Sequence, residues 1–140
     1  MACERARCRA TLPRMAFHRV FVYGTLLAGE ANHHWLRGAP CLGAWRTPAC
    51  YRLFSLGAYP VLVPGGRYAV EGEMYRVDEA GLALLDRLED YPVDYLRRQL
   101  RTPFGPAWVY YQKQPPQGGR LLPHGNWRRV RARPTVGEPQ

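Results

Sequence analysis

The sequence contains almost no serine and almost no lysine. Ser55 is the single serine, and it stands in LFSLG rather than in the G-x-S-x-G turn that presents a serine nucleophile, so serine hydrolysis is disfavoured. Lys113 is the single lysine among 20 basic residues, a bias from which no function follows. No G-x-x-x-x-G-K-[ST] loop and no G-x-G-x-x-G turn after a strand is present, which argues against nucleotide chemistry.

Metal and redox motifs are missing as well. The four cysteines have no C-x-x-C spacing and no suitably placed histidine partners; they are Cys3, Cys8, Cys41 and Cys50. His33 and His34 are adjacent rather than one helical turn apart, so we interpret them as surface or capping residues. We expect free thiols, a cytoplasmic location, no metal and no cofactor.

No export or membrane-spanning segment is predicted. Arg14, His18 and Arg19 interrupt the first candidate apolar segment, and no run approaches the roughly 18 apolar residues that a spanning helix needs. Met15 stands a few residues before the first strand-like run, which raises the hypothesis that residues 1–14 are an extension from an upstream start; whether they belong to the native protein stays open.

The positive charge is concentrated at the two ends. The formal net charge is +9, of which residues 1–19 carry +4 (five Arg, one Glu) and residues 128–140 carry +3 (four Arg, one Glu). Such ends are typical of flexible tails, so a specific nucleic-acid domain is disfavoured. We expect an N-terminal extension at 1–18, one folded domain at 19–127 and a basic C-terminal tail at 128–140.

Strand-like runs dominate the central segment. They lie at 19–24, 44–54 with a break at Pro48, 59–63, 67–77, 94–102 and 107–114. In VEGEMYRV the alternation puts Glu71, Glu73 and Tyr75 on one face, which is therefore partly polar. Residues 31–36 form at most two helical turns. Many short strands with one main helix predict an α+β fold with a twisted or barrel-like sheet.

The main helix ends on a carboxylate where its apolar stripe should continue. Asp78 is the predicted N-cap and Pro92 cannot extend the helix, so we expect it to run from about 78 to about 90. Leu82, Leu85 and Glu89 share one face by helical spacing. Burial beside leucines and the negative end of the helix dipole would both raise the pKa of Glu89.

A carboxyl with a raised pKa is a candidate proton shuttle near neutral pH. The alternative, that Glu89 rotates into solvent at a fraying helix end, stays open from the pattern alone. The second candidate element is VYGTLLAGEANH, where Gly24 follows the first strand and lets the backbone present its N–H groups to an anion.

Taken in order, several blocks resemble the γ-glutamylcyclotransferase-like family, including its γ-glutamylamine cyclotransferase branch and bacterial relatives. The resemblance covers residues 19–127 and rests on VFVYGTL, NHHWL, YP, GEMYRVD, LDRLEDYPVDYLR and AWVYYQ. It implies a small mixed or antiparallel β-barrel with flanking helices.

The resemblance also implies an activity and its residues. Members of the family cyclise a γ-glutamyl amide to 5-oxoproline, release the amine and use no cofactor, which makes them acyltransferases. The catalytic glutamate falls on Glu89. The substrate-binding residues fall on Tyr23, Gly24, Thr25 and Leu26 of the YGTL loop and on Tyr95. The implied partner is a small γ-glutamyl substrate; the oligomeric state and the leaving amine stay open, with γ-glutamylamines favoured over glutathione.

Three other functions remain open. A relative could bind a γ-glutamyl or amino-acid ligand without turnover, and a natural-product enzyme could remove a γ-glutamyl protecting group. The third is a binder of nucleic acid or an acidic partner through the Arg-rich ends, for which binding should fall steeply with salt.

Overall fold

The computed structural model describes residues 16–132. Its elements follow in chain order as β1 (Phe17–Val22), η3 (His33–Leu36), β2 (Cys41–Arg46), β3 (Tyr51–Ser55), β4 (Pro60–Pro64), β5 (Glu71–Asp78), α2 (Glu79–Leu88), β6 (Leu96–Leu100), β7 (Ala107–Tyr111), β8 (Arg120–Leu121) and α3 (Trp127–Ala132). Each predicted strand run overlaps at least one of these strands, and the ends of most runs differ by a few residues. The α+β class is confirmed.

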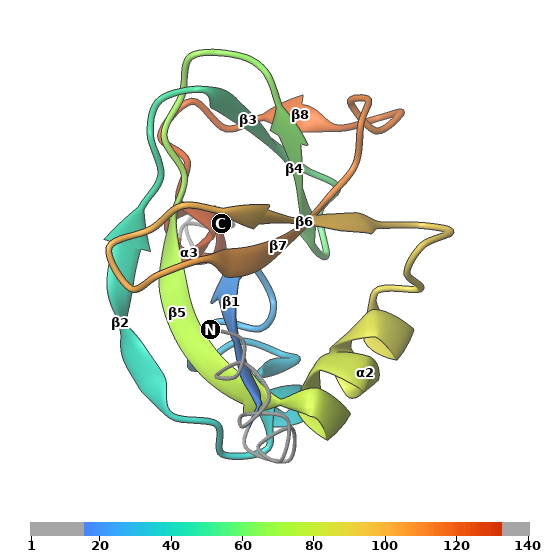
Figure 1. The fold of residues 1–140 in the computed structure, drawn as a ribbon. Coiled ribbons are helices and arrows are strands. Elements are labelled where there is room, and N and C mark those ends of the chain that lie inside the picture. The colour runs from blue at the N-terminus through green and yellow to red at the C-terminus, as the bar shows by residue number, and fades with distance from the viewer. Residues whose placement is uncertain (1–15, 133–140) are drawn as a thin grey trace.

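The strands form two sheets. The larger has the order β2-β5-β1-β7-β6 and the smaller the order β4-β3-β8. Figure 1 shows the smaller sheet lying across one end of the larger one, with α2 at the side. The pairings are antiparallel except for β1 with β7, which is parallel at Val20 and Trp108.

The predicted barrel is not confirmed. In the described part of the chain β2 and β6 are the edges of one sheet, and β4 and β8 are the edges of the other. The sheets approach where Gln112 N donates to Leu62 O at 3.0 Å, without forming a continuous ladder. Pro60 and Pro64 at the ends of β4 have no N–H to donate, which suits an edge strand.

The central strand β1 forms the middle of the core. Val20, Phe21 and Val22 are buried in succession, as expected for a strand that is covered on both faces. Leu82 and Leu85 of α2 are also buried, and the Asp78 carboxylate accepts a hydrogen bond from Gly81 N at 2.7 Å. The predicted apolar stripe and N-cap of this helix are therefore confirmed.

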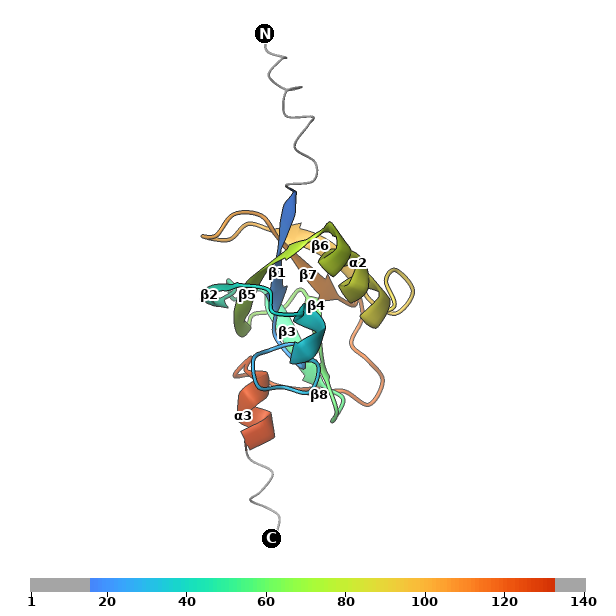
Figure 2. The same cartoon turned by 90° about the horizontal axis from the view of Figure 1, so that it is seen from below.

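The C-terminal end of the described chain differs from the sequence interpretation. Trp127–Ala132 form α3, and Trp127 is completely buried, although residues from 128 on were predicted to be tail. Figure 2 shows α3 at the end of the molecule opposite the start of β1. The helix is short, and it packs through Trp127 in the core and the partly buried Val130 three residues on. The extensions at 1–15 and 133–140 lie outside the described residues.

Candidate active site

A cavity of about 420 Å³ opens between the end of β1, the start of β4 and the end of α2. All six predicted site residues line it: Tyr23, Gly24, Thr25, Leu26, Glu89 and Tyr95. Segments that are far apart in sequence thus meet at one concave site of a size suited to a small molecule.

Glu89 lies at the C-cap of α2, one residue beyond the last helical position. The residue is partly buried, and within residues 16–132 its carboxyl group has no hydrogen-bond partner. Burial, followed by the negative charge of Asp94, raises the pKa of Glu89 from 4.5 to about 7. The predicted direction is confirmed, and Asp94 is a cause that the sequence analysis did not name. Near neutral pH this carboxyl can both accept and donate a proton.

The raised pKa predicts a cost in stability. The pKa of Glu89 is about 7 in the folded protein and 4.5 in its ordinary, unfolded environment. The folded state therefore binds the proton more tightly than the unfolded state does, and the free energy of unfolding falls as pH rises from about 4.5 to about 7. Glu89→Gln removes this titration. We expect the variant to be more stable than wild type by roughly 2 to 3 kcal/mol at pH 8, and the difference to vanish at pH 4.5. Urea denaturation at both pH values measures it, and equal differences at the two would contradict the assignment.

The loop after β1 has backbone N–H groups with no acceptor in the described part of the chain. Among the described residues, none accepts a hydrogen bond from the N–H groups of Gly24, Thr25 and Leu26, and these three residues line the cavity. The loop is closed internally by Leu27 N to Gly24 O at 3.0 Å and Asn32 N to Thr25 O at 2.8 Å. Unpaired, held N–H groups form a concave site for a carboxylate or a polarised carbonyl.

Gly24 is required by a close approach to β4. A Cβ built on Gly24 would lie 2.5 Å from Pro60 Cγ, well inside contact distance. Because Gly24 has no side chain, the loop can pack directly on Pro60, which also lines the cavity.

The two predicted tyrosines are held by backbone groups. The Tyr23 hydroxyl donates to Tyr110 O at 2.8 Å and accepts from Leu62 N at 3.3 Å, and the Tyr95 hydroxyl donates to Pro60 O at 3.2 Å. Burial raises the pKa of both phenols, so they stay protonated as donors. Their rings line the cavity while their hydroxyls fix the two sheets around it.

Several lining residues were not predicted as site residues. Asp94, Asn32 and Tyr110 line the cavity, as does Tyr59, which is 41% exposed at its rim. The sequence pattern did not indicate a site role for these residues. Each lies in a loop or strand whose distance from Glu89 is set by the tertiary fold. The YP block that includes Tyr59 is part of the family resemblance, but the sequence analysis assigned Tyr59 no role.

His33 contacts the backbone of the loop that follows β1. Its Nδ1 donates to Leu26 O at 2.9 Å, and its ring meets Tyr75 edge-on. Within residues 16–132 no group of three or more His, Cys, Asp or Glu side chains is arranged to hold a metal ion. Over the same range, no helix has the length and apolar character needed to cross a membrane.

The fold and the cavity define a small α+β protein with a ligand-sized site that combines a titrating carboxyl group with unpaired backbone donors. The model for the family described as "Gamma-glutamyl cyclotransferase, AIG2-like" matches residues 20–129. The chain belongs to this family.

Individual relatives agree with the family match. A Vibrio cholerae protein, provisionally named a gamma-glutamylcyclotransferase, is 49% identical over 110 residues, covering 79% of this chain and 95% of that protein. The human gamma-glutamylaminecyclotransferase is 41% identical over 96 residues, 59% of this chain and 60% of the human protein. A crystal structure of a mouse AIG2-like protein superposes with a TM-score of 0.69 at 30% identity, covering 79% of this chain and 88% of the mouse chain.

Proposed function

We propose that the protein cyclises the γ-glutamyl group of a γ-glutamyl amine or amide to 5-oxoproline and releases the free amine, with Glu89 as general acid and base. The observation that carries the proposal is the Glu89 carboxyl, whose pKa of about 7 suits proton transfer in both directions within the cavity. The name of the human relative, gamma-glutamylaminecyclotransferase, supports the same reaction.

The nucleophile in this reaction belongs to the substrate. The α-amine attacks the γ-carbonyl carbon, a C–N bond forms, and Glu89 takes the proton that the amine loses. The protonated Glu89 then donates to the leaving nitrogen as the original amide C–N bond breaks. No water is consumed and no enzyme nucleophile is needed, because correctly oriented intramolecular attack reaches effective molarities of roughly 10⁵ to 10⁸ M.

The loop donors suit the glutamyl part of the substrate. The N–H groups of Gly24, Thr25 and Leu26 would bind the α-carboxylate or stabilise the oxyanion that develops on the γ-carbonyl. Both groups are anionic at the relevant moment, and backbone N–H groups donate without adding a charge that would lower the pKa of Glu89.

The charge of the cavity favours amines without a nearby carboxylate. Although the chain has 20 basic residues, the described lining includes the carboxyl groups of Glu89 and Asp94 and neither Lys nor Arg. A neutral or cationic leaving group suits this lining, and so does lysine bound through its ε-nitrogen, because its α-ammonium balances its carboxylate. The alanine and dipeptide leaving groups of γ-glutamyl-alanine and glutathione carry a carboxylate with no such ammonium, and this carboxylate finds no cation in the lining. This supports γ-glutamylamines over glutathione.

The test is 5-oxoproline release from γ-glutamyl-ε-lysine, a γ-glutamylated aminoglycoside, γ-glutamyl-alanine and glutathione. We expect the first two to be turned over faster. Release from any of them by the wild-type protein establishes the cyclotransferase, and the ranking tests the charge argument. A folded protein that releases 5-oxoproline from none, yet is stabilised by a γ-glutamyl compound in a thermal-shift assay, would support the non-catalytic binding relative instead.

The pH dependence tests the role of Asp94. The acid limb of kcat/KM reports the ionisation of the general base in the free enzyme, expected near pH 7. Asp94→Asn removes the negative charge that raises the pKa of Glu89, so the acid limb should move to lower pH by roughly half a unit. Burial keeps the pKa above 4.5. If the acid limb stays at the same pH or moves to higher pH, Asp94 does not raise the pKa of Glu89.

A further inference from the structure

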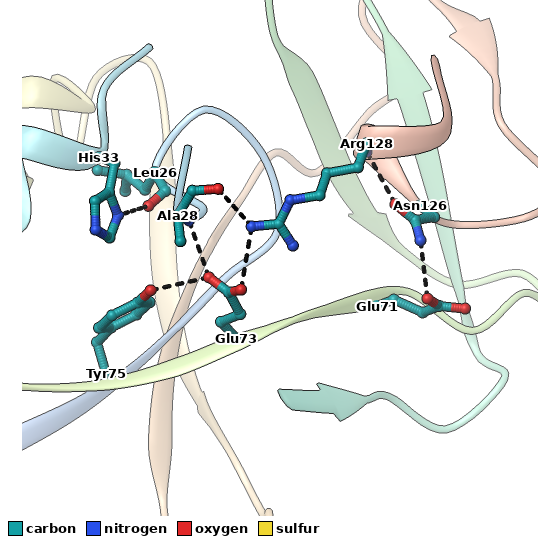
Figure 3. Close-up of polar contacts among 8 residues, drawn as sticks. All are labelled: Leu26, Ala28, His33, Glu71, Glu73, Tyr75, Asn126 and Arg128. Atoms are coloured by element: carbon teal, nitrogen blue, oxygen red, sulfur yellow. Dashed lines mark hydrogen bonds and ion pairs between the residues drawn. The ribbon is translucent and has the colours of Figure 1, made fainter. Parts of the chain in front are cut away.

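A polar cluster that does not line the Glu89 cavity contacts the loop directly. The Glu73 carboxylate accepts from Ala28 N at 3.0 Å, and Arg128 Nη2 donates to Ala28 O at 2.6 Å. Arg128 Nη2 also donates to Glu73 Oε2 at 3.1 Å, so Ala28, Glu73 and Arg128 are all connected to one another (Figure 3). Both polar groups of Ala28 are thus held by a connected ion pair from β5 and α3.

The position of Glu73 explains how it reaches the loop. Glu73 pairs in register with Val22, the last residue of β1, so its side chain lies where the chain leaves the sheet. The Tyr75 hydroxyl donates to Glu73 Oε1 at 2.9 Å and fixes the carboxylate further. Although burial opposes ionisation, the hydrogen bonds from Ala28, Tyr75 and Arg128 lower the pKa of Glu73 below its ordinary value. The carboxylate therefore stays charged at neutral pH.

The contact acts close to the cavity. Ala28 follows Leu26 by two residues, and the N–H groups of Gly24, Thr25 and Leu26 have no protein acceptor in the described chain. Donors that bind an anion must be held in place before it arrives, because ordering them on binding lowers affinity. Side-chain hydrogen bonds to a loop backbone supply that restraint.

We propose that Glu73 and Arg128 are positioning residues, which clamp Ala28 and thereby hold the Gly24–Leu26 donors in their ligand-binding arrangement. The catalytic consequence rests on the proposed function, whereas the restraint of the loop does not. The proposal assigns the first residues of the basic C-terminal segment to the support of the site.

The chain offers matched controls for each half of the clamp. Arg129 is exposed on the same helix, so Arg129→Met removes the same charge as Arg128→Met without touching Ala28. Glu71 lies on the same strand and accepts from Asn126 Nδ2 at 2.9 Å, so Glu71→Gln matches Glu73→Gln without a contact to the loop. Arg128→Lys retains one charged donor and serves as the rescue variant.

The experiment combines steady-state kinetics with hydrogen exchange of the loop amides that have an acceptor, which are those of Leu27, Ala28 and Glu30. In Arg128→Met and Glu73→Gln we expect amide exchange in this loop to be about tenfold faster, as local opening becomes easier, and KM to rise about tenfold with a smaller change in kcat. Arg129→Met and Glu71→Gln should match wild type, and Arg128→Lys should lie between.

Loop exchange in Arg128→Met equal to that in Arg129→Met overturns the clamp, whatever the kinetics. Faster loop exchange with unchanged KM in an active enzyme overturns the positioning role. If the wild type releases no 5-oxoproline, the proposed function fails, and the exchange comparison still decides whether Glu73 and Arg128 restrain the loop.

Discussion

Glu89→Gln is expected to lower the rate of 5-oxoproline release by roughly 10² to 10⁴, the usual contribution of a general acid and base. The amide is nearly isosteric with the carboxyl and cannot transfer the proton between the α-amine and the leaving nitrogen. Because the Glu89 side chain has no hydrogen-bond partner in the described residues, its replacement breaks no structural contact. The fall should appear in kcat as well as in kcat/KM, measured at pH 7 and pH 8 with the best substrate of the panel.

Asp94→Asn is the matched control for this loss, since it makes the same change of carboxylate to amide in the same cavity. It should shift the pH profile while retaining activity within about tenfold of wild type. If Glu89→Gln keeps activity within a few-fold of wild type, or if Asp94→Asn is the variant that loses it, Glu89 is not the general acid and base. Circular dichroism of both variants ensures that a loss is not due to unfolding.

Asp86→Ala is expected to lower stability by roughly 2 to 3 kcal/mol, because it removes the partner of two groups that remain partly buried. Arg97 binds Asp86 through Nε at 2.7 Å and Nη2 at 3.1 Å, and the Tyr110 hydroxyl donates to the same carboxylate at 2.8 Å. Arg97 is also stacked between Tyr91 and Trp108, so it cannot simply turn to solvent without losing those contacts. Asp86 thus ties α2 to β6 and β7.

For a domain of this size the loss corresponds to a fall in Tm of roughly 6 to 12 °C, measurable by calorimetry. Glu79→Ala is the control: Glu79 belongs to the same helix and pairs with His18 at 2.9 Å, but its side chain is 69% exposed, so the change should cost less than about 1 kcal/mol. Similar Tm values for the two variants would show that Asp86 contributes no more than a surface ion pair.

Local periodicity was sufficient for the elements that carry the site. The spacing of Leu82, Leu85 and Glu89 predicted one helix face, and the two leucines are buried with Glu89 at the end of the same helix. The alternation of β5 placed Glu71 and Glu73 on one face, and both accept hydrogen bonds from residues near the start of α3. Such patterns are local because side-chain direction repeats with the backbone.

The missed features depend on long-range contacts. The helix α3 has too few residues to be stable alone, so its sequence did not predict a helix. It is stabilised by the packing of Trp127 into the core. The predicted barrel is not confirmed for a related reason, because whether edge strands meet depends on sheet twist and on the approach of β4 to β7 rather than on strand sequence.

The sequence alone determined the strands, the main helix and the resemblance that singled out Glu89, since these depend on neighbouring residues and on ordered motifs. Only the tertiary structure decided that Asp94 lies near enough to raise the pKa of Glu89, and that the Tyr23 and Tyr95 hydroxyls are bound to backbone carbonyls. It also decided that Ala28 is held by Glu73 and Arg128, which lie 45 and 100 residues away along the chain. Strand register and core packing create these contacts, and no local pattern encodes them.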